Sequence, residues 1–384
     1  MTTNSVPRGD VSVRVFGRTD VGRAREHNED AFLVADLSTE ATAMEPDLRE
    51  HVVSDRGIMF LVADGLGGAV SGEIASGMAV TVVRDTLRAR WGAAATSDAT
   101  AFAAALKEAT EAANAAIHAF ATQHPEHKGM GTTATVAGLL GDTLYVVQVG
   151  DSRGYLIRDG VAEQITKDQS LMQRLIEAGE LTPEEAEQSE RRNIILQALG
   201  PEPVVKIDLT HQSVRRGDTL VLCTDGLSGL VRRDEIAAIV TQEEDLEAAC
   251  DRLIERANDR GGPDNITVVI ARFEGNGLQS VTSEDSVGHT IFALAGSTPP
   301  GVPAERRGSG APDGRSVGQR PDVGSMSWAL RGNMPYVLAF IAAVLVALFF
   351  VITRLRVDPA PPPPPAATDS VGAVPLPASM VDDA

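Results

Sequence analysis

Short apolar runs follow one another along this chain with brief turns between them, and this order restricts the fold more than any other feature. Turns such as Gly141-Asp142 and Asp159-Gly160 separate successive strand-like runs, and few helical stretches come between them. Strands joined in this way pair antiparallel, whereas a doubly wound parallel sheet needs a helix after nearly every strand. We therefore expect an α+β fold of antiparallel sheets with helices packed outside.

The expected elements follow from hydrophobic periodicity and from glycine and proline punctuation. Strands are expected at Val11–Phe16, Ala31–Ala35, Ile58–Ala63, Thr132–Leu140, Leu144–Val149, Gly154–Ile157, Val204–Leu209, Thr219–Cys223 and Ile266–Phe273. Helices are expected at Gly72–Trp91, Ala99–Thr122, Ser170–Ala178, Asp234–Val240 and Glu244–Asn258.

Composition excludes some classes of function. The 384 residues carry a formal charge of -19, which disfavours binding to nucleic acid or to anionic lipid. Two cysteines, Cys223 and Cys250, are too few for a disulfide framework, so we expect a reduced, cytosolic domain. The tail at residues 1–10 has no apolar stretch of the kind found in a cleaved signal peptide.

Composition also divides the chain into zones. Residues 11–273 have the pattern of a globular domain, and residues 274–334 turn to Gly, Ser, Pro and Arg, as in a disordered linker. Residues 335–353 carry no charge and are long enough for a transmembrane helix. More arginines precede this span than follow it, which predicts a single-pass protein of the cell membrane with a cytoplasmic globular domain. Residues 354–384 then form a Pro-rich extracytoplasmic tail.

Acidic residues stand at the ends of several apolar strands. Asp64 follows Ile58–Ala63, Asp225 follows Thr219–Cys223 and Asp151 follows Leu144–Val149. A carboxylate in such a place is costly unless it is paired or bound to a cation. Each site taken singly is also explained by ordinary turn chemistry, because Asp-Gly is common in turns.

Further acids precede strands, and the full set favours metal binding. Asp264 stands just before Ile266–Phe273, and Glu29 and Asp30 stand just before Ala31–Ala35. All these candidates are hard oxygen ligands, which suit Mg²⁺ or Mn²⁺ better than zinc or copper. Two such ions about 3.5–4 Å apart would hold a bridging hydroxide for in-line attack on phosphorus.

The ordered motifs resemble those of the PPM metal-dependent protein phosphatases, the type 2C class, and in particular its bacterial membrane-anchored members. They are Arg25-Glu-His-Asn-Glu-Asp30, Asp64-Gly-Leu-Gly-Gly68, Gly131-Thr-Thr133, Val149-Gly-Asp-Ser-Arg153, Thr224-Asp-Gly-Leu227 and Gly262-Pro-Asp-Asn-Ile-Thr-Val268. The resemblance implies a four-layer αββα sandwich that hydrolyses phosphoserine and phosphothreonine in proteins without a phosphoenzyme. It also implies phosphorylated protein partners, among them Ser/Thr kinases and their substrates.

The resemblance further implies a role for each matching position. Asp64 would bridge two catalytic metals, with Asp225 and Asp264 completing the first site. The Gly65 carbonyl and Glu29 would serve the second site, with Asp30 acting through water. Asp151 would join Asp225 in a third, weaker site. Arg25 would grip the substrate phosphate, although by itself it also fits a plain surface charge.

Two departures from the family pattern stand out. Leu66 occupies a place where eukaryotic members often carry a histidine proposed as general acid, so no acid is assigned. Gln169 stands where relatives commonly show histidine, ahead of a polar segment at residues 171–198 that resembles their substrate-selecting flap. Arg153 is expected to brace the Asp151 turn, and residues 37–56 form a loop without a recognisable motif.

Three other classes of function compete with an active protein phosphatase. A catalytically dead relative would bind metal or a partner, but all the expected carboxylates are present. A hydrolase of nucleotides or small phosphoesters is disfavoured because Gly65-Leu-Gly-Gly68 lacks the Lys-Ser/Thr of a P-loop. A purely structural membrane protein does not explain an acid-lined soluble domain.

Overall fold

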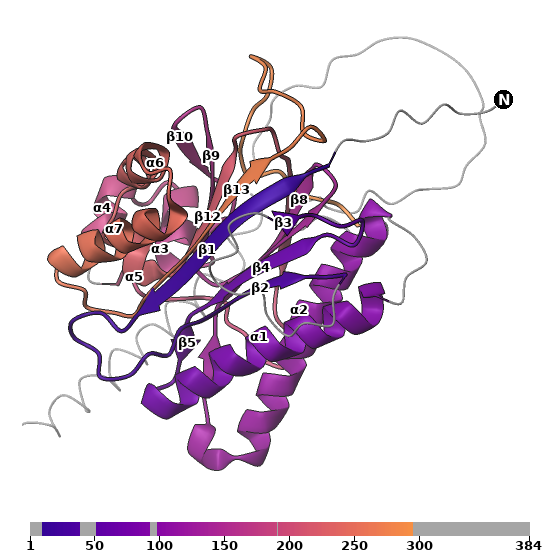
Figure 1. Cartoon of the computed structure of the whole chain (residues 1–384). Helices are drawn as coiled ribbons and strands as arrows, with labels where there is room; N and C mark the ends of the chain where they lie inside the picture. Colours follow the sequence, from indigo (N-terminus) through magenta and orange to yellow (C-terminus); the bar gives the residue numbers. More distant parts are fainter. Residues whose placement is uncertain (1–9, 39–50, 93–97, 190, 295–384) are drawn as a thin grey trace, which may run out of the picture. The chain divides into compact units, whose positions relative to one another are not determined.

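The computed structural model describes residues 10–38, 51–92, 98–189 and 191–294, and within them two antiparallel sheets (Figure 1). The six-stranded sheet has the order β10-β9-β12-β13-β1-β3 and the five-stranded sheet the order β11-β8-β7-β4-β2. The first comprises β1 (Ser12–Asp20), β3 (His51–Val52), β9 (Arg153–Arg158), β10 (Val161–Gln164), β12 (Thr219–Cys223) and β13 (Ile266–Glu274). The second comprises β2 (Ala31–Asp36), β4 (Ile58–Ala63), β7 (Ala134–Leu140), β8 (Thr143–Val149) and β11 (Asp208–Ser213). Short strands β5 (Gly65–Leu66) and β6 (Gly131–Thr132) form a separate pair.

Two long helices cover one sheet and two shorter ones cover the other, as Figure 1 shows. Helices α1 (Ala69–Gly92) and α2 (Ala99–Gln123) pack on the five-stranded sheet. Helices α6 (Arg233–Gln242) and α7 (Leu246–Asp259) pack on the six-stranded sheet. The shorter α3 (Leu171–Glu177), α4 (Pro183–Glu187), α5 (Asp225–Ser228) and the 3₁₀ turn Pro125–His127 lie in connections.

Three apolar layers hold this sandwich together. The central layer lies between the sheets, where Phe60 of β4 meets Phe273 of β13 edge to face. The outer layers lie under the helices, with Trp91 and Phe102 in one and Leu253 in the other. Strand residues contribute side chains to all three layers. Because these side chains are closely packed, the strand ends are held in place relative to one another. The predicted α+β fold of two antiparallel sheets flanked by helices is confirmed.

Local sequence explains why the helices begin where they do. Asp98 caps α2 by accepting a hydrogen bond from the Thr100 amide, and Asp245 caps α7 in the same way through Glu247. Thr182 and Glu185 form a reciprocal capping box at α4, and Pro183 occupies the first turn of this helix.

Two expectations are corrected. The strand expected at Val204–Leu209 is instead β11 at Asp208–Ser213, and Val204 is 83% exposed. β11 is a polar edge strand, so apolar periodicity located it poorly. The globular domain also extends past Phe273, because residues 275–294, expected to belong to the linker, make ordered contacts with β11 and its flanking turn.

Several expectations fall outside the described residues: the tail at 1–9, most of the 37–56 loop, the linker from 295 to 334, the 335–353 helix and the 354–384 tail. Among the helices of the described ranges, none combines the length and the hydropathy that a membrane crossing requires.

Candidate active site

The two sheets bring their acid-bearing strand ends to the same end of the sandwich. Ala31 of β2 pairs with Ala63 of β4, which sets Asp30 beside Asp64 across the strand pair. The Asp64 carbonyl accepts a hydrogen bond from the Thr133 amide at 2.9 Å, just before β7. On the other sheet the Thr224 amide, next to Asp225, donates to the Thr267 carbonyl of β13.

Asp64 lies at the centre of this group. Its pKa is raised well above the ordinary value by desolvation and by repulsion from Asp30, Asp225, Asp151 and Asp264. Repulsion strong enough to shift a pKa requires close approach. Asp64 therefore lies near enough to these four carboxylates for their charges to interact, and the metal-binding roles expected for them stay predictions.

Asp225 and Asp30 sit deep in the same cluster. Desolvation and repulsion from Asp264 raise the pKa of Asp225, while a hydrogen bond with Asp64 opposes the rise. Desolvation raises the pKa of Asp30 to about 7, although Thr224 and Thr267 donate to its Oδ2 at 2.9 and 2.6 Å. These two hydroxyls orient Oδ2 of Asp30, while Oδ1 is buried without a hydrogen-bond partner in the described chain.

Asp151 follows β8 and is only 6% exposed. Desolvation, with repulsion from Asp225 and Asp168, raises its pKa to about 8. Arg153 bonds Asp168 through Nε and Nη2, the latter at 2.7 Å, and so fixes the segment opposite this turn. The arginine is thus engaged with Asp168 and with the Tyr155 hydroxyl, and its expected bracing of the Asp151 turn stays a prediction.

Glu29 and Gly65 meet at a tight backbone approach. A Cβ on Gly65 would lie 2.3 Å from the Gly72 carbonyl oxygen and 2.5 Å from that of Glu29. A Cβ on Gly72 would lie 2.6 Å from Glu29 Oε2. Glycine is therefore required at both positions, because any side chain would displace the Glu29 carboxylate or the 65–68 loop.

Arg25 lies beside the carboxylates and is partly exposed to solvent. Its Nη2 lies 2.8 Å from Asp264 Oδ2, and its side chain is 47% exposed. Burial lowers the pKa of Arg25, but attraction to Asp264, Glu29 and Asp64 outweighs that effect and raises it. The guanidinium is thus held beside the carboxylates with part of its surface open to a ligand.

Asn265 ties the Arg25 segment to β13. Its Oδ1 accepts from the Glu29 amide at 2.8 Å, and its Nδ2 donates to the Val21 and His27 carbonyls at 3.0 and 2.9 Å. The residue is 4% exposed, so it acts on the fold of the loop and not on a substrate.

The donor set fits hard divalent cations. Asp30 Oδ1 and Asp151 Oδ1 are buried, and neither has a hydrogen-bond partner in the described chain. Orphaned carboxylate oxygens at such depth are costly unless a cation is their partner. Within the described ranges, no three His, Cys, Asp or Glu side chains stand close enough together to form a ready-made metal site.

Sequence reasoning missed several residues that build this site. Thr224, Thr267 and Asn265 lie inside the quoted motifs, but their hydrogen bonds to Asp30 and to the 21–29 loop were not predicted. Asp168 lies beside a motif, and its pairing with Arg153 was not foreseen. Gly72 gave no local signal, because its importance arises only when α1 packs against Glu29.

An antiparallel αββα sandwich with a cluster of carboxylates at one end defines a metal-dependent hydrolase. The family model described as Protein phosphatase 2C matches residues 43–269, and the chain belongs to that family. It is accordingly a protein serine/threonine phosphatase.

Named relatives and solved structures agree with this assignment. The serine/threonine phosphatase stp of Listeria innocua is 35% identical over 253 residues, covering 66% of this chain and 93% of the relative. The serine/threonine protein phosphatase PstP of Mycobacterium tuberculosis is 38% identical over 260 residues, covering 67% of this chain but 45% of the relative.

Crystal structures give the same picture. The Mycobacterium tuberculosis phosphatase PstP/Ppp aligns with a TM-score of 0.58 at 36% identity, covering 68% of this chain and 99% of that one. The catalytic domain of PstP in complex with 2 manganese ions aligns with a TM-score of 0.55 at 36% identity, covering 69% of this chain and 99% of that one. A structure of this family thus carries the ions that the carboxylate cluster fits.

Proposed function

We propose that this chain hydrolyses phosphoserine and phosphothreonine in proteins with the help of two divalent metal ions, Mn²⁺ or Mg²⁺. The observation that carries the proposal is that Asp30 and Asp151, close to Asp64, each keep a buried Oδ1 atom without a hydrogen-bond partner in the described chain. Names of relatives such as the stp phosphatases support the substrate class.

The residues that would hold the ions follow from the geometry and the family resemblance. Asp64, Asp225 and Asp264 would hold one ion, and Asp64, Glu29 and the Gly65 carbonyl the other, with Asp30 behind them. Asp151 and Asp225 would hold a third. When bound, such ions activate a water nucleophile and offset the charge of the phosphoryl oxygens.

Arg25 is the group of this chain placed to bind the substrate phosphate. Its exposed guanidinium lies next to the carboxylate cluster, and its planar donors match two phosphate oxygens. A dianionic phosphate would compete with Asp264 for Arg25, so binding of substrate and loosening of this ion pair are coupled.

The cysteines are unsuited to covalent catalysis. Cys223 and Cys250 are fully buried, and desolvation raises the pKa of Cys223 to about 12. A thiol in that state is neither ionised nor reachable at neutral pH. This supports direct hydrolysis without a cysteinyl-phosphate intermediate.

The cellular setting is part of the proposal. Phosphorylated proteins, including Ser/Thr kinases and their substrates, would be the partners. The apolar residues 335–353 would anchor the chain in the cell membrane with the catalytic domain on the cytoplasmic side. A cysteine placed after Asp358 should then react with an impermeant reagent from outside intact cells, and reaction only after lysis would reverse this orientation.

Metal-dependent turnover tests the chemistry. The chain should release phosphate from a phosphothreonine peptide with Mn²⁺ or Mg²⁺ and not in EDTA, and should act less on a matched phosphotyrosine peptide. Asp64→Asn should lose metal binding and turnover together while its circular dichroism spectrum is unchanged. A wild-type chain that binds Mn²⁺ but releases no phosphate would favour a non-catalytic binding module.

A further inference from the structure

Residues 275–294 form a strap, here called the C-terminal strap, that follows β13 and lies beyond the stretch matched by the family model, which ends at 269. The strap is polar and holds no helix or long strand, yet it is fixed to the domain at several points. It is also the part of the described chain that leads toward the expected membrane segment at 335–353.

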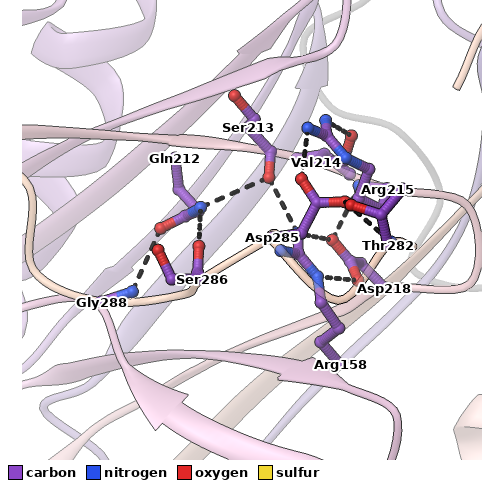
Figure 2. Close-up of polar contacts among 10 residues, drawn as sticks. All are labelled: Arg158, Gln212, Ser213, Val214, Arg215, Asp218, Thr282, Asp285, Ser286 and Gly288. Carbon is purple, nitrogen blue, oxygen red and sulfur yellow. Dashed lines mark hydrogen bonds and ion pairs between the residues drawn. The ribbon is translucent and has the colours of Figure 1, made fainter. Parts of the chain in front are cut away.

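Asp285 provides the first anchor (Figure 2). Its Oδ1 accepts from Arg215 Nη2 at 2.6 Å, and its Oδ2 accepts from the Thr282 amide and hydroxyl, both at 2.9 Å. The Arg215 amide in turn donates to Asp218, whose carboxylate is paired with Arg158 at 2.6 Å. The hydrogen bond from Arg215 holds the pKa of Asp285 far below its usual range.

The Arg158–Asp218 pair is almost fully enclosed, with side chains 7% and 0% exposed. A buried, bidentate pair has one good geometry, so it gives Arg215 and the strap a rigid base. Figure 2 shows Asp285 beside Arg215 and Asp218 beside Arg158, with the Ser213 carbonyl also bonded to Arg158.

The second anchor lies along β11, the edge strand of the five-stranded sheet. Gln212 donates to the Ser286 carbonyl at 3.0 Å and accepts from the Gly288 amide at 3.1 Å. The His211 amide donates to the Thr290 carbonyl and the Phe292 amide to the Leu209 carbonyl, both at 2.9 Å. The strap thereby pairs with an edge that would otherwise expose its backbone groups.

Phe292 fixes this pairing with its ring. It meets Tyr145 of β8 and His211 of β11, each with ring centroids 5.3 Å apart and nearly perpendicular planes. Aromatic pairs in this geometry contribute stability beyond that of the apolar area they bury. The strap is therefore held to β11 by main-chain hydrogen bonds and by the ring contacts of Phe292.

β11 leads from the strap to the active site. Its first residue, Asp208, accepts from Gln169 Nε2 at 3.2 Å, as does the Lys206 carbonyl. The Gln169 side-chain oxygen Oε1 accepts a hydrogen bond from the Gly150 main-chain N–H at 3.0 Å. The Gln169 main-chain N–H donates to the Gly150 carbonyl at 2.8 Å. Gly150 immediately precedes Asp151.

Gln169 also holds the segment at 171–198. Its carbonyl accepts from the Leu196 amide at 2.7 Å, so one residue ties both the Asp151 turn and the base of this segment to β11. We propose that Gln169 is a positioning residue for Asp151 and that the C-terminal strap, by closing the β11 edge, keeps Gln169 in place. The inference rests on the proposed role of Asp151 in metal binding.

A strap-release variant tests the inference in the full-length chain. Asp285→Ala with Phe292→Ala removes the first anchor and the ring contacts that support the second, and Glu284→Ala, an exposed neighbour, is the matched control. The release variant should need about fivefold more Mn²⁺ for half-maximal turnover, at the lower end of coupling between linked sites. The control should match the wild type.

A double-mutant cycle tests the route through Gln169. In a Gln169→Ala background the release variant should cause little further loss, because both changes break the same connection. An undiminished effect in that background, or a release variant with the Mn²⁺ dependence of Glu284→Ala, would overturn the inference.

Hydrogen exchange supplies a readout that does not depend on activity. The amides of Gly150 and Leu196 should exchange faster in the release variant, while those of β4 and β7 keep wild-type rates. Asp285→Asn alone is the milder variant if the double change unfolds the chain, and unchanged Gly150 exchange in it refutes the coupling. Failure of the proposed function would be seen separately, as a wild-type chain without turnover.

Discussion

The cluster of carboxylates predicts that the free energy of unfolding of the metal-free chain depends on pH in an unusual way. The pKa of Asp151 sets the size of this effect. The pKa of this buried carboxyl rises from 3.8 to about 8, chiefly because of desolvation and repulsion from Asp225. Between those values the folded chain binds more protons than the unfolded chain, so the free energy of unfolding falls as pH rises. Above about pH 8 the loss from Asp151 is complete.

The magnitude follows from the same shift. A rise from 3.8 to about 8 is worth roughly 5 to 6 kcal/mol at about 1.4 kcal/mol per tenfold change in proton affinity. Asp64, Asp225 and Asp151 share their repulsion, so one substitution recovers only part of it. We expect Asp151→Asn to stabilise the metal-free chain at pH 8 by about 2 kcal/mol, or roughly 5 °C in melting temperature.

The assay is thermal unfolding followed by circular dichroism in EDTA at pH 5 and pH 8. The gain from Asp151→Asn should shrink at pH 5, where the wild-type carboxyl is protonated. Glu255→Gln, which removes an exposed charge on α7, controls for net charge and should change little. An Asp151→Asn chain that melts no higher than the wild type at pH 8 would refute the argument from mutual repulsion.

Three further predictions concern the residues around the cluster. Gly72→Ala places a methyl group 2.6 Å from Glu29 Oε2 and should weaken Mn²⁺ binding about tenfold by calorimetry, whereas Gly77→Ala, with open space around its Cβ, should not. Asn265→Ala removes one buried and two partly buried hydrogen bonds and should cost about 2 kcal/mol in urea unfolding, and a loss under 0.5 kcal/mol would contradict the bracing role. Arg25→Ala should raise KM for a phosphopeptide about tenfold with a smaller change in kcat, and the reverse pattern would place Arg25 in the chemical step.

The sequence was most informative where a residue type conflicts with its local environment. An aspartate that directly follows an apolar strand, as at Asp64 and Asp225, can be recognised from the sequence alone because the strand and the acid are adjacent in the chain. The turn between β7 and β8 at Gly141-Asp142 was likewise legible from local chemistry. Antiparallel pairing sets Asp30 beside Asp64 within one sheet, whereas the approach of Asp225 from the other sheet depends on how the two sheets pack.

Other features depend on contacts between distant segments and left no local trace. Gly72 looks like an ordinary helix glycine until α1 meets Glu29, some forty residues earlier in the chain. The C-terminal strap reads as a linker because its polar residues are ordered by Arg215 and by β11 and not by a core of their own. β11 was placed a few residues too early because its sequence is polar and carries little apolar periodicity.

The cluster and the strap illustrate one physical relation between stability and function. Strand ends held by three apolar layers cannot move apart to relieve repulsion between Asp64 and Asp225, so the free energy of that repulsion is retained in the folded chain. A divalent cation that binds there relieves the repulsion between the carboxylates, and the free energy so released adds to the affinity for the metal. Metal affinity is then a consequence of rigid packing. Any contact that keeps the strand ends rigid, including the strap on β11, should then contribute to metal affinity even though it lies away from the ligands.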